Sequence, residues 1–432
     1  MYDGKKFGVF GLGLSGIATI DYLNKKNIEF IAFDDSLKSI SIISSNKPEL
    51  ADNLKNLSDD SWSKIDYLIL SPGISLTYPK PHPVVEMANK INAKIICDIE
   101  LFYLNNKDNY YIGITGTNGK STTTALIGHI LQYNKVNAVV GGNIGVPVLS
   151  LDSKEKTVFI FEVSSFQLDL LEKIKFNIAL LINISPDHLD RHGNFENYKE
   201  SKYKIFNNQS PKDKAIINID LAKVNEAITF SERKEADFKV LDNVLYFGGK
   251  NYDIAFNNSL MGKHNQQNLS AAIACCYTYG LSIEQIIESI PSFVGLKHRM
   301  QYLGEYNEVK FINDSKATNA DSTSKALASF DNIIWIVGGV EKEGGIEPLK
   351  EYFPKIKKAL LIGASQENFA KTLSNQVSWE KCDNLNNAFN IACKIASSRD
   401  VILLSPACAS YDQWKNFEAR GDAFIELVKE YN

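Results

Sequence analysis

Cysteine is scarce in this 432-residue sequence, and its spacing excludes two classes of cross-linked protein. The six cysteines lie far apart except for one adjacent pair, at Cys97, Cys275, Cys276, Cys382, Cys393 and Cys408. Such spacing forms neither a disulfide framework nor a zinc-ligand pattern. It is typical of proteins of the reducing cytosol, and we therefore expect a cytoplasmic location.

The sequence also lacks long apolar runs and blocks of one charge. No segment reaches the ~18 consecutive apolar residues that a membrane helix needs. The 47 Lys and Arg, against 51 Asp and Glu, form no basic cluster, which argues against nucleic-acid or anionic-membrane partners. Lys5-Lys6 and the apolar Phe7–Ile20 imitate a signal peptide, but glycines interrupt the stretch and no small-x-small cleavage site follows.

Chain length and hydrophobic patterning predict three α/β domains. At roughly 100–200 residues per domain, the chain holds two to four of them. Strand-like apolar runs alternate with helical stretches, which is typical of parallel sheets with helices on both faces. The polar stretches Asn105–Asn109 and Pro291–His298 read as linkers. The predicted α/β domains cover residues 1–100, 101–297 and 298–432.

A glycine-rich segment, Gly11–Gly16, has the pattern GxGxxG near the N-terminus. A strand-like run precedes it, a helical stretch follows, and the acids Asp34-Asp35 end the second predicted strand. This context fits the dinucleotide fingerprint, in which glycines let a phosphate approach a helix N-terminus. A tight turn without a ligand is the alternative, and these residues do not distinguish NAD from another nucleotide.

The strongest local signal is Thr115-Gly-Thr-Asn-Gly-Lys-Ser121, between an apolar strand and a predicted helix over 122–130. In such loops backbone N–H groups cradle phosphates; here Lys120 would neutralise the β- and γ-phosphates, and Ser121 would offer a hydroxyl to Mg²⁺. The segment departs from GxxxxGK[ST], because Ile114 stands where the first glycine belongs. The flanking strand and helix still favour a phosphate-binding loop over a chance Gly-Lys-Ser.

Acids, imidazoles and a lysine follow later strands of the same domain. Glu162 ends the strand 158–161, where it is either a Mg²⁺ ligand or a solvated acid at a helix start. Asn183–His192 gathers two imidazoles and two carboxylates after another strand end, a position that favours catalysis over a structural cluster. Lys202, in a helical stretch over 195–206 with other lysines, reads by composition as a surface lysine.

Three further polar segments lie in the second half of the chain. Gly262–Asn268 precedes a predicted helix over 269–279, and capping explains its side chains as well as ligand binding does. Asn313–Asn319 follows a strand and can bring an acid and a lysine to a sheet edge. Ser405–Asp422 also leaves a strand end; its Cys408 has no identifiable base, which favours a small buried residue over a nucleophile.

Together these segments resemble the Mur ligases, ATP-dependent amino-acid ligases of peptidoglycan synthesis, over essentially the whole chain. The family's shared segments are similar to Thr115–Thr122, Glu162–Gln167, Asp187–His192, His264–Asn268 and Asp314–Asn319. The branch of the family that adds D-glutamate is similar in particular to Gly11–Gly16, Ser71–Ile74, Asp98–Phe102 and Leu404–Phe417. The resemblance implies ATP-dependent ligation of D-glutamate to UDP-N-acetylmuramoyl-L-alanine through an acyl phosphate, by a monomer with small-molecule partners. It also implies that the N-terminal and C-terminal domains are Rossmann-like and that the central domain is a P-loop ATPase with a mostly parallel sheet.

The resemblance also implies a role for each matching residue. The expected catalytic residues are Lys120, Glu162, His188 and Lys202. The expected ATP-binding residues are Gly116, Thr117, Asn118, Gly119, Lys120, Ser121, Thr122, Asn265, Asn268, Arg299, Asp314 and Lys316. The UDP-linked substrate would contact Leu14, Ser15, Asp35, Ser36, Gly73, Asn143 and His188, and D-glutamate would contact Thr318, Lys342, Ser410 and Phe417.

Two Mg²⁺ ions are implied as well, with the ligands Ser121, Glu162, His188 and Lys202. Lys202 would be carbamylated by CO₂, which turns a cation into an anion that supports the second ion. The chain lacks the basic residue that relatives often carry after the acid of the second strand, since Asp34-Asp35-Ser36 has none.

The alternatives are another Mur ligase, a folylpolyglutamate synthetase-like amide ligase, a nicotinamide dehydrogenase and a non-catalytic nucleotide switch. Gly11–Gly16 and Ser405–Phe417 argue against the first two. A dehydrogenase leaves Thr115–Ser121 without a use, and a switch does not need Glu162, His188 and Lys202 together.

Overall fold

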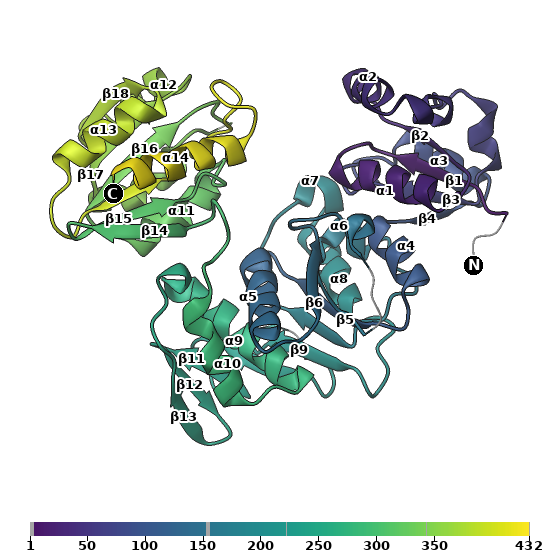
Figure 1. The fold of residues 1–432 in the computed structure, drawn as a ribbon, viewed down its shortest axis with the longest axis horizontal. Coiled ribbons are helices and arrows are strands. Elements are labelled where there is room, and N and C mark those ends of the chain that lie inside the picture. The colour runs from purple at the N-terminus through teal and green to yellow at the C-terminus, as the bar shows by residue number, and fades with distance from the viewer. Residues whose placement is uncertain (1–3, 153–155, 222, 343, 432) are drawn as a thin grey trace. The chain divides into compact units, whose positions relative to one another are not determined.

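The computed structural model describes residues 4–152, 156–221, 223–342 and 344–431 and contains three β-sheets (Figure 1). Its contacts define two compact units. The first unit comprises the chain up to Ala255 together with Gln266–Ile290, and it carries two of the sheets. The second comprises Phe256–Asn265 and the chain from Pro291 onward, and it carries the third. The predicted α/β class with mostly parallel sheets is confirmed, and the domain boundaries at 100/101 and 297/298 stay predictions.

The first sheet has four parallel strands in the order β2-β1-β3-β4. The strands are β1 (Phe7–Phe10), β2 (Phe30–Phe33), β3 (Tyr67–Leu70) and β4 (Lys94–Ile96). The helices are α1 (Leu14–Lys25), α2 (Leu37–Asn46), α3 (Pro83–Lys90) and α4 (Asp98–Asn105), with 3₁₀ turns at Pro48–Asn53 and Asp60–Lys64. All four residues of β1 are buried, as expected of a parallel strand covered on both faces.

The second sheet has nine strands in the order β13-β12-β11-β10-β9-β8-β5-β7-β6. They are β5 (Tyr110–Thr115), β6 (Ala138–Gly142), β7 (Val158–Glu162), β8 (Ile178–Leu181), β9 (Lys214–Asn218), β10 (Ile228–Ser231), β11 (Phe238–Leu241), β12 (Val244–Phe247) and β13 (Lys250–Asp253). Its helical segments are α5 (Lys120–Tyr133), α6 (Ser165–Leu168), α7 (Leu189–His192), α8 (Phe195–Tyr203), α10 (Ile283–Ser289) and the 3₁₀ turns Val148–Ser150 and Lys204–Phe206. The phosphate-loop strand β5 therefore lies between β7, which ends at Glu162, and β8, which precedes the polar segment Asn183–His192.

The last two strands of this sheet are antiparallel, and the sequence analysis did not predict them. Asp242-Asn243 and Gly248-Gly249 form the two hairpin turns, and all four residues have positive φ. Such pairs are the residues that two-residue hairpins favour. The turn signal was therefore present in the sequence.

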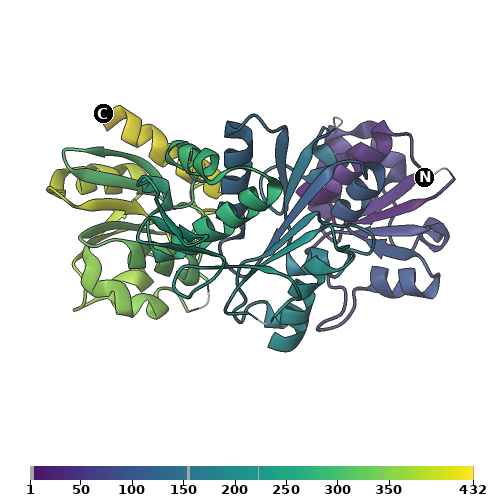
Figure 2. The same cartoon turned by 90° about the horizontal axis from the view of Figure 1, so that it is seen from below.

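The third sheet, in the second unit, has the order β14-β15-β19-β16-β17-β18, with only β14 antiparallel to its neighbour. Its strands are β14 (Gln301–Tyr306), β15 (Val309–Asn313), β16 (Ile333–Gly338), β17 (Ile356–Ile362), β18 (Trp379–Asp383) and β19 (Val401–Leu404). The helical segments are α11 (Ala320–Ser329), α12 (Gln366–Leu373), α13 (Leu385–Ile395), α14 (Phe417–Tyr431) and the 3₁₀ turns Asn258–Leu260, Ile290–Ser292 and Glu347–Lys355. Figure 2 gives a second view of the same elements.

One predicted boundary is wrong. Helix α9 runs over Lys263–Tyr279 and begins six residues before the predicted start, so His264, Asn265 and Asn268 lie inside the helix and do not precede it. The polar residues of this first stretch gave no apolar periodicity, which hid the helix start.

We predict that Gly16→Ala destabilises the chain whereas Gly13→Ala does not. A Cβ at Gly16, in α1, would meet the carbonyl oxygen of Gly11 at 1.9 Å, whereas a Cβ at Gly13 would meet nothing within 4 Å. Forcing an atom into packed backbone costs about 1–3 kcal/mol, and we expect a melting temperature lower by several degrees for Gly16→Ala alone. Thermal unfolding of both variants tests this, and equal midpoints would contradict it.

Candidate active site

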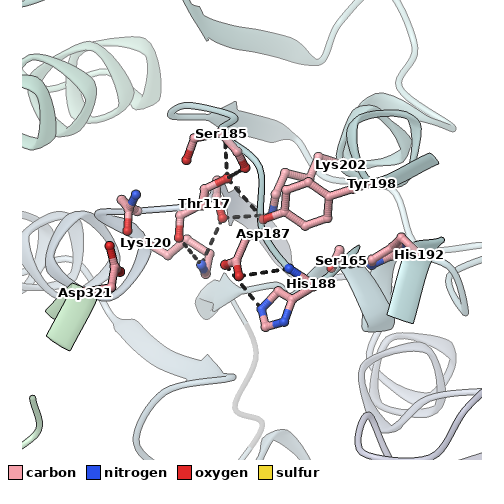
Figure 3. A network of polar contacts seen from close by, with 12 residues as sticks. Thr117, Lys120, Ser165, Ser185, Asp187, His188, His192, Tyr198, Lys202 and Asp321 are labelled. Carbon is pink, nitrogen blue, oxygen red and sulfur yellow. Dashed lines mark hydrogen bonds and ion pairs between the residues drawn. The ribbon is translucent and has the colours of Figure 1, made fainter. Parts of the chain in front are cut away.

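The phosphate-loop segment connects β5 to the N-terminus of α5, as predicted. Gly119 caps the helix with a φ of +83°, and a Cβ there would meet the Asn268 side-chain oxygen at 2.1 Å. Glycine is needed on both counts. Lys120 Nζ donates to the carbonyls of Gly116 and Thr117 at 2.9 Å each (Figure 3).

Asn183, just beyond β8, holds this loop from the neighbouring strand. Its Oδ1 accepts the backbone N–H groups of Thr117 and Asn118 at 3.1 and 2.9 Å, and its Nδ2 donates to the Asn118 carbonyl. Thr117 and Asn118 belong to the predicted ATP set, but in this structure their N–H groups are engaged by Asn183. The sequence analysis placed Asn183 in a polar segment without this role.

Glu162, at the end of β7, is a buried carboxylate with one oxygen left over. Its side chain is only 2% exposed; Oε1 accepts a hydrogen bond from Asn143 Nδ2 at 3.2 Å, and Oε2 is buried without a hydrogen-bond partner. A buried, unsatisfied carboxylate oxygen is costly unless a cation or donor completes it. The solvated-acid interpretation is therefore wrong, and the carboxylate fits a Mg²⁺ ion.

The rest of a metal set is sparse. Ser121, in the first turn of α5 directly after Lys120, is buried. Within the described residues no group of three or more His, Cys, Asp or Glu side chains could hold a metal ion. Mg²⁺ commonly takes one or two carboxylates and completes its shell with water and substrate phosphates, so this donor set suits Mg²⁺ bound together with a nucleotide.

Lys202, on α8, is buried, and the surface interpretation from composition is wrong. Its side chain is 1% exposed; Nζ donates to the Gly116 carbonyl at 2.8 Å and lies 4.6 Å from the centre of the Tyr198 ring (Figure 3). Burial, aided by the charge of Lys120, lowers the pKa of Lys202 to about 7. An amine with this pKa is neutral in a substantial fraction near neutral pH.

The two histidines of the predicted cluster have different environments. His188 precedes α7 with a φ of +51°, has a half-exposed side chain, and lies 3.5 Å from a carboxylate oxygen of Asp187. His192 is buried; its ring stacks on Phe166 and its Nε2 contacts Ser165 Oγ at 3.0 Å. Burial lowers the pKa of His192. His188 is thus the histidine that remains accessible to a ligand.

Of the residues predicted to contact the UDP-linked substrate, all but Asn143 and His188 lie around the first sheet. Leu14 is 80% exposed at the start of α1, Ser36 caps α2, and Asp35 pairs with His82 at 3.0 Å. The Ser15 hydroxyl donates to the buried Asp98 at 2.6 Å, so its proton is already committed. Gly73 is exposed, and its carbonyl accepts a hydrogen bond from Arg191.

Asp34, the acid of the dinucleotide-like fingerprint, is used within its own domain. Its carboxylate accepts the backbone N–H groups of Leu12 and Ser36. Asp34 therefore closes the glycine-rich loop onto the start of α2. A carboxylate that binds ribose in a dehydrogenase must remain available to it, which weakens that alternative.

The second unit carries the other predicted ATP residues. Asp314 is buried, accepts the Ser405 hydroxyl at 2.8 Å and the Met300 N–H at 3.1 Å, and has its pKa raised by burial to about 7. The positive charge of Arg299 partly offsets that rise. Asn265 donates to the Met261 carbonyl at 2.7 Å.

The predicted D-glutamate residues divide between buried and exposed positions of this unit. Ser410 is buried, Thr318 and Phe417 are half-buried, and Lys342 is exposed. Lys316 Nζ lies 5.8 Å from the centre of the Phe417 ring. Cys408 is buried with its pKa raised by burial to about 12, which confirms the prediction of a small buried residue.

Arg420 holds together the two predicted polar segments of this unit, Asn313–Asn319 and Ser405–Asp422, by hydrogen bonds. The sequence analysis assigned it no role. It is fully buried; Nε and Nη2 donate to the hydroxyl and carbonyl of Ser315, Nη2 also donates to the Cys408 carbonyl, and Nη1 has no hydrogen-bond partner. Burial lowers its pKa to about 10. Its position near the start of α14 gave no signal, because an arginine on a helix is usually solvated.

These features are typical of an α/β protein that binds a nucleotide. A phosphate loop lies next to a strand that ends in a buried carboxylate with one unsatisfied oxygen, and a second lysine, Lys202, donates to a carbonyl of the loop. Family models match three parts of the chain: the Mur ligase MurD-like N-terminal domain (5–97), the Mur ligase middle domain (114–276) and the Mur ligase glutamate ligase domain (298–408). The chain belongs to the Mur ligase family.

Two curated relatives match at full length. The UDP-N-acetylmuramoylalanine–D-glutamate ligase of Rickettsia prowazekii (strain Madrid E) is 43% identical over 449 residues, 100% of this chain and 99% of the relative. The enzyme of that name from Agrobacterium fabrum (strain C58 / ATCC 33970) is 41% identical over 454 residues, 99% of this chain and 95% of the relative.

Solved structures support the fold. The UDP-N-acetylmuramate-alanine ligase MurC of Thermotoga maritima has a TM-score of 0.60 and 17% identity, covering 99% of this chain and 100% of its own. The MurF ligase of Thermotoga maritima, solved in complex with ADP, has a TM-score of 0.59 and 16% identity, covering 100% and 97%.

We predict that Asp314→Asn stabilises the chain increasingly as pH rises. The folded pKa of about 7 exceeds the value of about 3.9 for an exposed aspartate, so between these pH values the folded state holds a proton that the unfolded state has released. The wild-type chain therefore loses stability over that window, and an amide does not. The melting temperature of the variant should exceed that of wild type by about 3 °C or more at about pH 8, and by less at about pH 5.

Asp331→Asn is the matched control, because Asp331 is exposed in the same unit. Its effect should not change between the two pH values. A difference between Asp314→Asn and wild type that stays constant with pH would contradict the raised pKa.

Proposed function

We propose that this chain ligates D-glutamate to UDP-N-acetylmuramoyl-L-alanine with ATP, in peptidoglycan precursor synthesis. The observation that carries the proposal is the full-length similarity to two ligases of that name, at 43% and 41% identity. The family models cover the segments that carry the resemblance. The N-terminal model includes Gly11–Gly16, the middle model includes Thr115–Ser121, and the C-terminal model ends at Cys408, within the segment from β19 to α14. Another Mur ligase is the remaining alternative within the family.

The reaction requires an activated carboxylate, because an amine does not displace oxide from a carboxylate at useful rates. The alanyl carboxylate attacks the γ-phosphorus of ATP, ADP leaves, and an acyl phosphate forms. The neutral amine of D-glutamate then attacks the acyl carbon, the bond to phosphate breaks, and the nitrogen loses a proton. Closure of the domains around the acyl phosphate would exclude the water that hydrolyses it.

The phosphate loop supplies charge and orientation for the first step. Lys120, at the N-terminus of α5, neutralises the transferring phosphate, as lysine clamps do in other phosphoryl transfers. The remaining ATP residues would come from the loop and α9 (Gly116, Thr117, Asn118, Gly119, Ser121, Thr122, Asn268) and from the second unit (Asn265, Arg299, Asp314, Lys316). The orphaned Oε2 of Glu162 and the hydroxyl of Ser121 would hold Mg²⁺, which supplies further neutralisation of the phosphate charge.

The two other substrates would be held at the first and third sheets. The UDP part would contact Leu14, Ser15, Asp35, Ser36 and Gly73, with Asn143 and His188 nearer the reacting end. D-glutamate would be held by Thr318, Lys342, Ser410 and Phe417. Supporting this division, Asn143 is hydrogen-bonded to Glu162, so a substrate contact there lies next to the proposed metal ligand.

A carbamate on Lys202 would complete a second Mg²⁺ site together with His188. Burial and the lowered pKa support it, since only the neutral amine reacts with CO₂ and the product carries a negative charge. The anion would also remove the repulsion between Lys202 and Lys120, which meet at the Gly116 carbonyl.

We place the reaction in the cytoplasm and expect a monomer. All six cysteines are free thiols, as expected of a protein from a reducing compartment. In the part of the chain that the structure describes, no helix is long and apolar enough to cross a membrane.

Substrate specificity tests the proposal directly. Phosphate release should be measured with UDP-N-acetylmuramoyl-L-alanine, ATP, Mg²⁺ and a panel of acceptors: D-glutamate, L-glutamate, L-lysine and diaminopimelate. D-glutamate alone should give turnover, and Lys120→Ala should lower the rate about 100-fold or more while the fold is retained. Equal or better activity with L-lysine or diaminopimelate would overturn the specific assignment.

The modification of Lys202 makes a second prediction. Lys202→Ala should lose most activity, and a short carboxylate such as formate or acetate should restore part of it by occupying the vacated site. Lys202→Arg should stay inactive, because a guanidinium keeps its charge and forms no carbamate. Removal of CO₂ should lower wild-type activity, and bicarbonate should restore it.

Lys199→Ala is the matched control, since Lys199 lies on the same helix but pairs with Glu196 at the surface. Its activity should equal that of wild type under every condition. Normal activity of Lys202→Ala in CO₂-depleted buffer would return Lys202 to a structural role.

A further inference from the structure

Arg191, on α7, binds three consecutive backbone carbonyls of the first sheet region. Its Nη1 donates to the Gly73 carbonyl at 2.9 Å, and its Nη2 donates to those of Ile74 and Pro72 at 2.9 and 3.4 Å. Both elements belong to the first compact unit. Among the described residues no carboxylate pairs with Arg191, and its hydrogen-bond partners are these carbonyl oxygens.

The guanidinium also lies over a ring in Glu162–Gln167, a segment that carries an expected catalytic residue. Arg191 Cζ is 4.7 Å from the centre of the Phe166 ring, and that ring lies 5.1 Å from His188 and 5.2 Å from His192. Phe166 is the second residue of α6, a few residues after Glu162. Arg191 therefore lies beside the proposed metal ligand His188 in two ways: through the Phe166 ring, and through its backbone N–H, which donates to the His188 carbonyl at 3.0 Å.

The loop that Arg191 holds is bonded in turn to the glycine-rich turn. The Ser71 hydroxyl donates to the Gly11 carbonyl at 2.6 Å, and the Ser71 N–H donates to the Phe10 carbonyl at 3.0 Å. A small cavity lies where this loop meets the helices α6 and α7 of the second sheet. It is lined by Ser71, Ile74, Phe166, Leu170, Arg191 and His192, among others. The contact is thus not packed solid, and the guanidinium hydrogen bonds cross it beside this cavity.

We propose that Arg191 is a positioning residue for the UDP-linked substrate. Its guanidinium fixes the Ser71–Ile74 loop, and with it the glycine-rich turn, relative to the expected catalytic residues Glu162 and His188. The inference rests on the proposed function, because it presumes that the UDP part binds at the first sheet while the alanyl end reacts at the second. Three carbonyls from consecutive residues match the fork of donors on an arginine, and the single ammonium of a lysine cannot serve all three with the same geometry.

Arg191→Met and Arg191→Lys test the proposal in the full-length chain, with Arg233→Met as the matched control. Arg233 lies in the same unit, and its exposed guanidinium pairs with Asp220 at the surface. Arg191→Met should raise KM for UDP-N-acetylmuramoyl-L-alanine about tenfold or more, as expected when several charge-assisted hydrogen bonds are lost, and leave KM for ATP within about twofold. Arg191→Lys should give an intermediate KM, and Arg233→Met should match wild type.

Equilibrium binding of UDP-N-acetylmuramoyl-L-alanine, without ATP or amino acid, separates this inference from the proposed function. Weaker binding to Arg191→Met with an unchanged melting temperature supports the positioning role, whichever amino acid the enzyme accepts. Unchanged binding, an equal rise in both KM values, or loss of the fold in both Arg191 variants would overturn it and leave Arg191 as a structural bond. Failure of wild type to ligate D-glutamate would instead count against the proposed function.

Discussion

The carbonyl oxygen of Gly116 accepts hydrogen bonds from two lysines, and the chemistry proposed for the phosphate loop of the second sheet depends on this contact. Lys120 approaches from the helix that follows the loop, and Lys202 approaches from α8, more than eighty residues later. Two ammonium groups against one peptide oxygen repel each other, and burial lowers the pKa of Lys202. The loop is therefore suited to a polyanion, and Lys202 is suited to lose its proton.

Parallel strand order explains why the partners of this loop gather around it. β5 lies between β7 and β8, so Glu162 and Asn183, at or just beyond the ends of those two strands, flank the loop on either side. The second unit repeats the principle: Asp314 follows β15, Ser405 follows β19, and the two neighbouring strands place their side chains in hydrogen-bond contact. Carboxyl ends of parallel strands are where ligands bind in open α/β sheets.

Each unit contains a buried charged side chain with one polar atom that lacks a hydrogen-bond partner. Glu162 keeps one unsatisfied oxygen and Arg420 one unsatisfied nitrogen. A buried charge that is not fully paired costs stability, and such costs are commonly retained where a ligand completes the site. For Glu162 the adjoining phosphate loop indicates the ligand. For Arg420 the hydrogen bonds to Ser315 and Cys408 indicate a role in holding two loops together.

The sequence by itself determined the α/β class, the phosphate loop, the strand ends that carry polar residues, and the family. These depend on local patterns, since apolar runs, glycines and a Gly-Lys-Ser each act within a few residues. Only the tertiary structure decided that Lys202 is buried, that Glu162 lacks a partner, that α9 begins at Lys263, and that Arg191 and Arg420 bind backbone carbonyls of distant loops. Burial and hydrogen-bond partners depend on residues that are remote in the chain, and a lysine or arginine on a helix has the same local pattern whether it faces water or the core.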